Sequence, residues 1–121
     1  MKCDISFFES DGFIHCELEG RSESNAARSV AIELKGAVEK YGTTHILMKL
    51  HGLKVHMSIL DIYKQPGEFN VIGFPRHARI AAVIPGELWK DFEFIETVFV
   101  NDGYLFKVFD NEGAAREWLK Q

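Results

Sequence analysis

The chain contains a short apolar run, Ala78-Arg79-Ile80-Ala81-Ala82-Val83-Ile84, which ends at Pro85-Gly86. A helical pattern follows from Glu87 to about Val100, and Asn101-Asp102-Gly103 then turns the chain into a second run, Leu105-Phe106-Lys107-Val108-Phe109. Asp110-Asn111 opens a last helix that ends in Trp118-Leu119. This order of strand, helix, strand and helix predicts an α/β layer with a pair of parallel strands.

The first third of the chain reads as a hairpin followed by a helix. Ile5–Phe8 and Phe13–Glu19 flank a turn at residues 9–12. The alternation in the second run predicts a half-exposed strand, with His15, Glu17 and Glu19 on the face opposite Ile14, Cys16 and Leu18. A helical repeat covers about Glu23 to Tyr41, with Ser22 or Ser24 as the expected N-cap. The two runs are predicted to form an antiparallel pair of strands at one side of the sheet.

The middle of the chain supplies a central strand and a second helix. Thr44–Leu50 is almost continuously apolar, as expected for a strand covered on both faces, and His51-Gly52 is read as its end. A helix is expected from Met57 or Ser58, with Ile59, Ile62 and Tyr63 on its inner face. Pro66-Gly67 is predicted to break that helix before a short turn at residues 68–75.

Length and charge limit the functional classes. We place all residues, 1–121, in a single domain. The net charge of −4 and the lack of a basic stripe argue against nucleic acid as a partner, because phosphate binding needs clustered Lys and Arg. No apolar run reaches the roughly 18 residues of a membrane span, and no signal peptide is recognisable. These features predict a cytoplasmic protein.

The two cysteines, Cys3 and Cys16, fall in the two strands expected to be adjacent. A disulfide between them is compatible with that placement, but a domain of this size does not need one. For a cytoplasmic chain the favoured interpretation is two free, partly buried thiols.

No pattern of catalytic or metal-ligating residues assembles. The chain has no Gly-x-Ser-x-Gly elbow, no phosphate-binding glycine loop and no Cys-x-x-Cys or His-x-x-x-His pair. His51 and His56 flank one loop and His45 shares a strand face with His51, but zinc usually takes tighter local pairs. We therefore expect no catalytic residue, no metal site, no cofactor and no enzymatic activity.

Large apolar side chains gather around the third helical region. Two interpretations stay open for them. Most of them fill the core, or they line a groove between a mobile flap (residues 69–74) and the 87–100 helix that holds a small apolar ligand, a membrane surface or a partner helix. Trp89 and Phe94 are the members most expected to be exposed. The candidate set comprises Phe69, Ile72, Phe74, Trp89, Phe92, Phe94 and Phe99.

The whole order of elements, with several local sequences, resembles the STAS-like fold (sulphate transporter and anti-sigma factor antagonist), in its SpoIIAA-like branch. The residues that carry the resemblance are Tyr41-Gly42, His45–Leu50, Ala78–Val83, Phe106–Asp110 and Ala114–Leu119. The resemblance implies a mixed, mostly parallel sheet of about five strands, in the order β-β-α-β-α-β-α-β-α, with helices mainly on one face. It also implies a non-enzymatic domain that binds regulatory partners.

Members of this family can be switched by phosphorylation of a serine at the start of the helix after the central strand, and Ser58 falls there. The local sequence is His56-Met57-Ser58-Ile59, which lacks the acidic residue and the glycine of the Asp-Ser-Ser-Gly-like family sequence. An alternative role for Ser58 is a plain helix cap.

Two functions are carried forward. The first is a cytoplasmic binding module that acts through a protein partner, as a monomer or a homodimer. The alternative is a carrier or sensor of a small apolar ligand, or of a membrane surface that would place the protein peripherally at the membrane. The SpoIIAA-like branch has been compared with lipid-binding folds, which suits this alternative.

Overall fold

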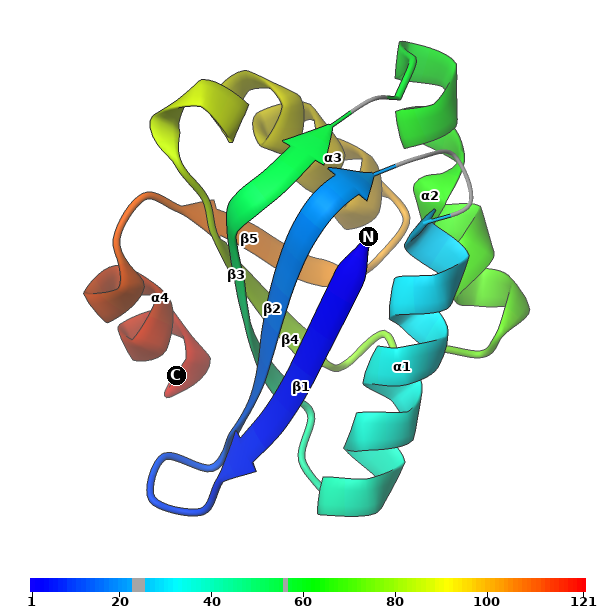
Figure 1. Cartoon of the computed structure of the whole chain (residues 1–121). Coiled ribbons are helices and arrows are strands. Elements are labelled where there is room, and N and C mark those ends of the chain that lie inside the picture. Colours follow the sequence, from blue (N-terminus) through cyan, green and yellow to red (C-terminus); the bar gives the residue numbers. More distant parts are fainter. Residues whose placement is uncertain (23–25, 56) are drawn as a thin grey trace.

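The computed structural model describes residues 1–22, 26–55 and 57–121 (Figure 1). Its centre is a five-stranded sheet in the order β1-β2-β3-β4-β5. β1 runs antiparallel to β2, and every other neighbouring pair is parallel. The strands are β1 (Lys2–Phe8), β2 (Phe13–Ser22), β3 (His45–Val55), β4 (Arg79–Val83) and β5 (Leu105–Phe109).

Among the described residues, three α-helices and one 3-10 turn connect the strands, and a fourth helix follows the last strand. Three helices cover one face of the sheet and the last helix covers part of the other face (Figure 1). The predicted order of elements and the predicted α/β class are both confirmed. The helices are α1 (Ala26–Tyr41), α2 (Ile59–Val71), α3 (Trp89–Asn101) and α4 (Glu112–Leu119), with the turn η1 (Gly86–Leu88).

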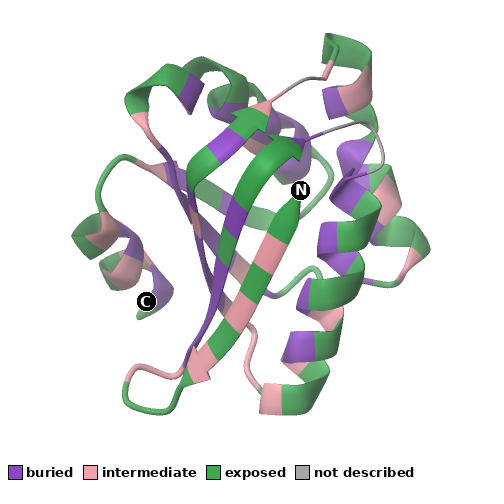
Figure 2. Cartoon of the chain, viewed as in Figure 1, coloured by how far each residue is buried: buried purple, intermediate pink, exposed green. Residues whose placement is uncertain are grey.

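The sheet separates two apolar clusters of unequal size. The larger one lies under α1, α2 and α3, and its centre includes Ile14, Leu34 and Ile46, all without exposed surface. The smaller one lies under α4, where Ala115 and Leu119 pack on Leu47. Figure 2 shows the consequence: β4 and the first halves of β2 and β3 are mostly buried, whereas β1 at the edge alternates half-buried and exposed residues. One face of β1 and β2 is therefore free of any described helix.

The central strand β3 is longer than predicted, because Gly52 continues the strand instead of ending it. Residues 52–55 pair with residues 19–22 of β2, after a register irregularity between Glu17 and Glu19. A Cβ atom at Gly52 would lie 2.9 Å from Cβ of Glu19. The glycine is needed for a close approach of two strands, and we had interpreted it as a stop signal.

The helix α2 is continuous, although Pro66 lies inside it. Proline removes one intrahelical hydrogen bond, and on that basis we had predicted a break. Pro66 and Phe69 are both buried, so packing of the second half of α2 offsets the lost bond. This half is also tied to α1 by an ion pair between Arg28 and Glu68.

Two predictions concern the region where β2 leads into α1. Ser22 is not an N-cap: it is the last residue of β2, and its hydroxyl faces the sulfur of Met57. The other proposed cap, Ser24, and the predicted helix start at Glu23 lie outside the described residues, as does His56. Within the described part of the chain, no helix has the length and apolar character required to cross a bilayer.

Candidate functional site

The start of α2 is fixed by a reciprocal cap around Ser58. The hydroxyl of Ser58 accepts a hydrogen bond from the backbone N–H of Asp61 at 3.1 Å, and the Asp61 carboxylate accepts one from the backbone N–H of Ser58 at 3.3 Å. Both bonds satisfy N–H groups that a helix start leaves free. The cap interpretation of Ser58 is confirmed, and the side chain is exposed at a helix N-terminus.

The first two turns of α2 expose three large apolar side chains. Ile59, Leu60 and Tyr63 are 73%, 61% and 68% exposed. Our assignment of Ile59 and Tyr63 to the inner face was wrong. The buried set on this helix is Ile62, Gln65, Pro66 and Phe69.

That buried set keeps the helical spacing but starts three residues later than we predicted. The apolar pattern alone does not show which face of the helix is buried, because the polar residue Gln65 occupies one of the buried positions. We call Ile59, Leu60 and Tyr63 the α2 patch.

A groove runs between the outer surfaces of α2 and α3, beginning at the α2 patch. Its volume is about 460 Å³. Tyr63 and Pro66 border it from α2, and Phe94 and Val98 border it from α3, with Lys64 and Asp102 among the polar groups. Phe94 is 36% exposed, as expected for a surface residue, while Trp89 is only partly exposed. The groove joins two helices that are rigidly held from beneath.

The predicted flap at residues 69–74 is not an exposed aromatic segment. Residues 69–71 form the last turn of α2, and both Phe69 and Phe74 are buried. The ring of Phe69 lies edge-on to Phe74 and to Phe99, with both centroid distances 5.0 Å. Phe92 is buried too, and Ile72 is half-buried. The core interpretation therefore holds for Phe69, Phe74, Phe92 and Phe99.

A polar cluster holds the end of α2 against the turn after α3. The Asn70 amide donates to the Asp102 carboxylate at 2.8 Å, and its carbonyl oxygen accepts from Arg76 at 2.7 Å and from the Tyr104 hydroxyl. The Arg76 guanidinium lies 5.1 Å from the centre of the Tyr104 ring. The Tyr104 phenol is protonated at neutral pH and can donate, and burial raises its pKa further above its ordinary value. The cluster fixes one end of the groove.

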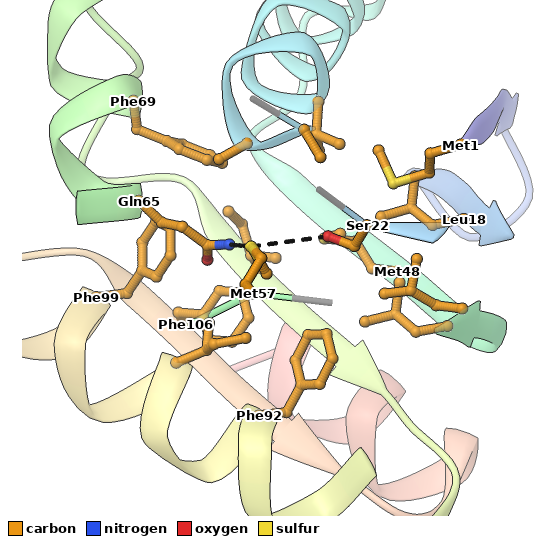
Figure 3. Close-up of a pocket in the computed structure, with 17 residues that line it drawn as sticks. Met1, Leu18, Ser22, Met48, Met57, Gln65, Phe69, Phe92, Phe99 and Phe106 are labelled. Carbon is orange, nitrogen blue, oxygen red and sulfur yellow. Dashed lines mark hydrogen bonds between the residues drawn. The ribbon is translucent and has the colours of Figure 1, made fainter. Parts of the chain in front are cut away.

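An apolar cavity of about 60 Å³ lies beneath α1, α2 and α3 (Figure 3). Phe69, Phe92 and Phe99 line it from the helices, and Met48 and Phe106 line it from the sheet. Three residues of the predicted groove set, Phe69, Phe92 and Phe99, therefore border a cavity that lies deeper than the predicted groove.

Two polar side chains of the cavity lining, Gln65 and Ser22, both approach the sulfur of Met57. The Gln65 amide lies 3.0 Å from this sulfur and the Ser22 hydroxyl 3.9 Å from it (Figure 3). The thioether is a weak acceptor for both donors. A molecule in the cavity with one polar acceptor group would be able to take the place of the Met57 sulfur as the acceptor for Gln65 and Ser22.

A second polar network, which sequence reasoning missed, lies on the opposite face of the sheet. The Asp11 carboxylate accepts from the backbone N–H of Phe13 at 2.9 Å, from His15 at 2.8 Å and from Arg116 at 3.0 Å. Arg116 also reaches Glu112 at 2.8 Å. Our hairpin prediction placed His15 on an exposed face, but Asp11 and the ring of Phe8 cover it. No local signal connects residues so far apart in the chain.

Within residues 1–22, 26–55 and 57–121, no three His, Cys, Asp or Glu side chains come together as a metal site would require. His45 packs edge-on against Phe13, and His51 is exposed. The two thiols lie on strands, away from helix N-termini that would stabilise a thiolate.

The architecture matches that of a solved regulatory protein. The structure of the anti-sigma factor antagonist SpoIIAA in its unphosphorylated form aligns over 98% of this chain and 98% of its own, with a TM-score of 0.53 and 14% sequence identity. The chain has the fold of SpoIIAA. The phosphorylated form of the Bacillus cell fate determinant SpoIIAA aligns over 97% of this chain and 99% of its own, with a TM-score of 0.49 and 12% identity. No protein-family model and no curated protein matches the sequence.

Proposed function

We propose that this chain is a non-enzymatic regulatory module of the bacterial cytoplasm that binds a protein partner through the α2 patch. The observation that carries the proposal is the exposure of Ile59, Leu60 and Tyr63 on the two turns that follow Ser58. The shared fold supports it, because SpoIIAA is an anti-sigma factor antagonist and acts on other proteins. At this level of identity the fold is evidence of architecture, so the patch carries the argument.

The groove beside the patch suggests what the partner presents. Its apolar residues Tyr63, Pro66, Phe94 and Val98 are bordered by polar side chains from both helices. This combination suits an amphipathic helix, whose apolar side chains enter the groove while its polar face stays in water. The partner surface in the proposal is therefore a helix with apolar residues at helical spacing.

Ser58 gives the proposed surface a means of regulation. A phosphate on Ser58 would place nearly two negative charges at the edge of the apolar patch. The N-terminus of α2 favours that charge, whereas the Asp61 carboxylate of the capping box opposes it. We propose that phosphorylation weakens partner binding, since an apolar helix would have to desolvate the phosphate.

The test is a comparison of baits that differ only at the surface. Proteins captured from the native cytoplasm by the wild-type chain are compared with those captured by Leu60→Asp and by the control Ile32→Asp. Ile32 on α1 is 54% exposed, close to the 61% of Leu60, so both changes add a charge at an exposed apolar site. A captured protein supports the proposed surface if, once purified, it binds wild type and Ile32→Asp alike and binds Leu60→Asp at least about tenfold more weakly.

A partner that binds Leu60→Asp as tightly as the wild type contradicts the proposed surface. Incorporation of phosphoserine at position 58 then tests the regulation separately. If the phosphorylated chain binds an established partner with unchanged affinity, the proposed regulation is contradicted but the proposed binding surface is not.

The cavity favours a second candidate function, the binding of a small apolar molecule. Seventeen residues line it, almost all of them apolar, with Gln65 and Ser22 as the polar exceptions. Its volume of about 60 Å³ is far below the several hundred Å³ of a typical ligand pocket. A larger ligand would therefore require α1 or α2 to move outward, which ranks this candidate second.

Native mass spectrometry of the chain purified without detergent tests the second candidate. A bound small molecule that is lost in Phe92→Trp, which fills the cavity, would support it. Sedimentation with liposomes tests the membrane version, and binding that survives the double change Trp89→Ala and Phe94→Ala would exclude this surface.

A further inference from the structure

Two thiols approach each other closely across the first hairpin. The sulfur atoms of Cys3 in β1 and Cys16 in β2 lie 3.5 Å apart, and both cysteines are free. Cys3 is paired in register with Leu18, and Cys16 is paired with Ile5, so the cysteines are diagonal neighbours on one face. Diagonal side chains on one face of a strand pair lie within reach of one another.

The two thiols differ in their access to solvent. Cys16 belongs to the larger core cluster and is 1% exposed, whereas Cys3 is half-buried. Cys3 also lies on β1, the edge strand of the sheet, which is bonded to β2 alone among the described strands. A small oxidant can therefore reach Cys3, and the movement that brings the two sulfurs to about 2.05 Å falls on an edge strand, which is paired on one side only.

We propose that Cys3 and Cys16 form a reversible disulfide when the protein meets a peroxide. The thiolate of Cys3 attacks one oxygen of hydrogen peroxide, so that Cys3 becomes a sulfenic acid and hydroxide leaves. The sulfur of Cys16 then attacks the sulfenic sulfur, the S–S bond forms and water departs with the Cys16 proton. In total two thiols are oxidised by two electrons, and one peroxide is reduced to two waters. A dithiol reductant reverses the step by thiol–disulfide exchange.

The surroundings of Cys3 make this oxidation slow at neutral pH. The hydrogen bond with Cys16, burial and the nearby Glu33 carboxylate all raise the pKa of the Cys3 thiol above its ordinary value. Because the thiolate is the reactive form, the rate of disulfide formation should increase as the pH rises from 7 to 9. The disulfide would therefore form during sustained contact with peroxide but not during a brief one.

The crosslink would act on one wall of the apolar cavity. Leu18, the register partner of Cys3, lines the cavity together with Met1, which precedes β1. A bond from Cys3 to Cys16 would hold the start of β1 on β2 and would fix both residues in place. It would also restrict the unfolded chain, since the two cysteines are 13 residues apart.

The experiment treats the purified chain with hydrogen peroxide at pH 7 and pH 9 and follows its intact mass. We expect a loss of about 2 Da, resistance of both cysteines to iodoacetamide, and recovery of both by dithiothreitol. The oxidised monomer should unfold about 5 to 10 °C higher than the reduced one. Cys3→Ser and Cys16→Ala serve as controls, and both should lose the mass change and the thermal shift.

Three outcomes would overturn the proposal. They are stepwise gain of oxygen atoms on Cys3 without loss of hydrogen, disulfides that join two chains, and no reaction at pH 9. Cys16→Ala keeps a small apolar side chain in the core, so an unfolded Cys16 control is not expected. If that control does unfold, Cys3→Ser on the half-buried side decides the question alone. Partner binding through α2 has no part in these readouts, so failure here leaves the proposed function untouched.

Discussion

The guanidinium nitrogen Nη1 of Arg116 lies 3.0 Å from Oδ2 of Asp11, although the two residues are 105 positions apart in the sequence. This bond joins the last helix, α4, to the tip of the first hairpin. Asp11 is the centre of the arrangement, because its carboxylate also accepts from the backbone of Phe13 and from His15. The turn of the first hairpin and the last helix are thus connected through one side chain.

The first prediction is that Asp11→Ala lowers the free energy of unfolding by about 2 kcal/mol. The change removes three hydrogen bonds at once and leaves His15 and Arg116 without their shared acceptor. Urea unfolding measures the loss. The control is Asp4→Ala, whose carboxylate is exposed in an ion pair with Lys2, and it should cost less than about 0.5 kcal/mol. Equal losses for the two variants would mean that the Asp11 network contributes little.

The second prediction is a loss of stability in acid that depends on Asp11 and Glu112. Burial raises the pKa of Asp11, but hydrogen bonds from Phe13, His15 and Arg116 outweigh it, so the pKa lies below its ordinary 3.8. Hydrogen bonds from Arg116 and Lys49 lower the pKa of Glu112 below its ordinary 4.5. Because both pKa values are lower in the folded chain, their stabilisation is complete above the ordinary values and disappears as the pH falls through the folded ones.

Unfolding free energies measured between about pH 7 and about pH 2 test this. The double variant Asp11→Asn and Glu112→Gln should be less stable at neutral pH and should show a shallower fall below about pH 5. A variant that falls as steeply as the wild type would place the acid sensitivity elsewhere.

The third prediction concerns the close strand approach at Gly52. Gly52→Ala should destabilise the chain by about 1 to 3 kcal/mol, because the new Cβ atom would meet Cβ of Glu19 at 2.9 Å. A second change, Glu19→Gly, removes the obstructing atom and should recover part of the loss. As a control, Gly36→Ala in α1 meets nothing within 4 Å and should stabilise by up to about 1 kcal/mol. Without any rescue in the double variant, the approach of β2 and β3 would not be the cause.

The fold was predictable where local patterns and tertiary packing agree. β4, α3, β5 and α4 follow short apolar runs and clear helical repeats, and their predicted bounds differ from the observed ones by at most two residues. Two of the errors lie at Gly52 and Pro66, because glycine and proline interrupt strands and helices in isolation. In both cases the surroundings overrule the local preference, since Gly52 allows a strand to approach and Pro66 is buried under packed helices.

The candidate site was predicted less well, for two physical reasons. Ile59 and Tyr63 share a helical face with Ile62, but the presence of Gln65 on the buried face shifts the true phase, which composition alone cannot show. The Asp11–Arg116 bond joins two segments that are far apart in the chain, and nothing in a single sequence indicates that they meet. By contrast, Ser58 could be placed correctly, because a serine three residues before an acidic residue is a local signature of a helix start.

The fourth prediction separates the two roles of Ser58. Ser58→Ala removes the hydroxyl that accepts from Asp61 and should cost about 1 kcal/mol of unfolding free energy. Ser58→Asn keeps a side-chain acceptor and should cost only a few tenths of that, while removing the hydroxyl that a kinase would modify. Urea unfolding of both variants checks the difference. A loss that is as large for Ser58→Asn as for Ser58→Ala would show that the capping bond is not what stabilises this helix start.

The fifth prediction distinguishes core aromatic residues from surface ones around the groove. Phe69→Ala should lower the unfolding free energy by about 3 to 5 kcal/mol, because the ring is buried against Phe74 and Phe99 and its removal enlarges the neighbouring cavity. Phe94→Ala, on the adjacent helix but 36% exposed, should cost less than about 1 kcal/mol. Chemical unfolding of the two single variants measures the contrast. If Phe69→Ala were as mild as Phe94→Ala, the end of α2 would be loosely packed and the 69–74 segment would be mobile after all. A large loss for Phe69→Ala would leave Tyr63 of α2 and Phe94 of α3 as the aromatic side chains of the groove that a partner can contact without rearrangement of the core.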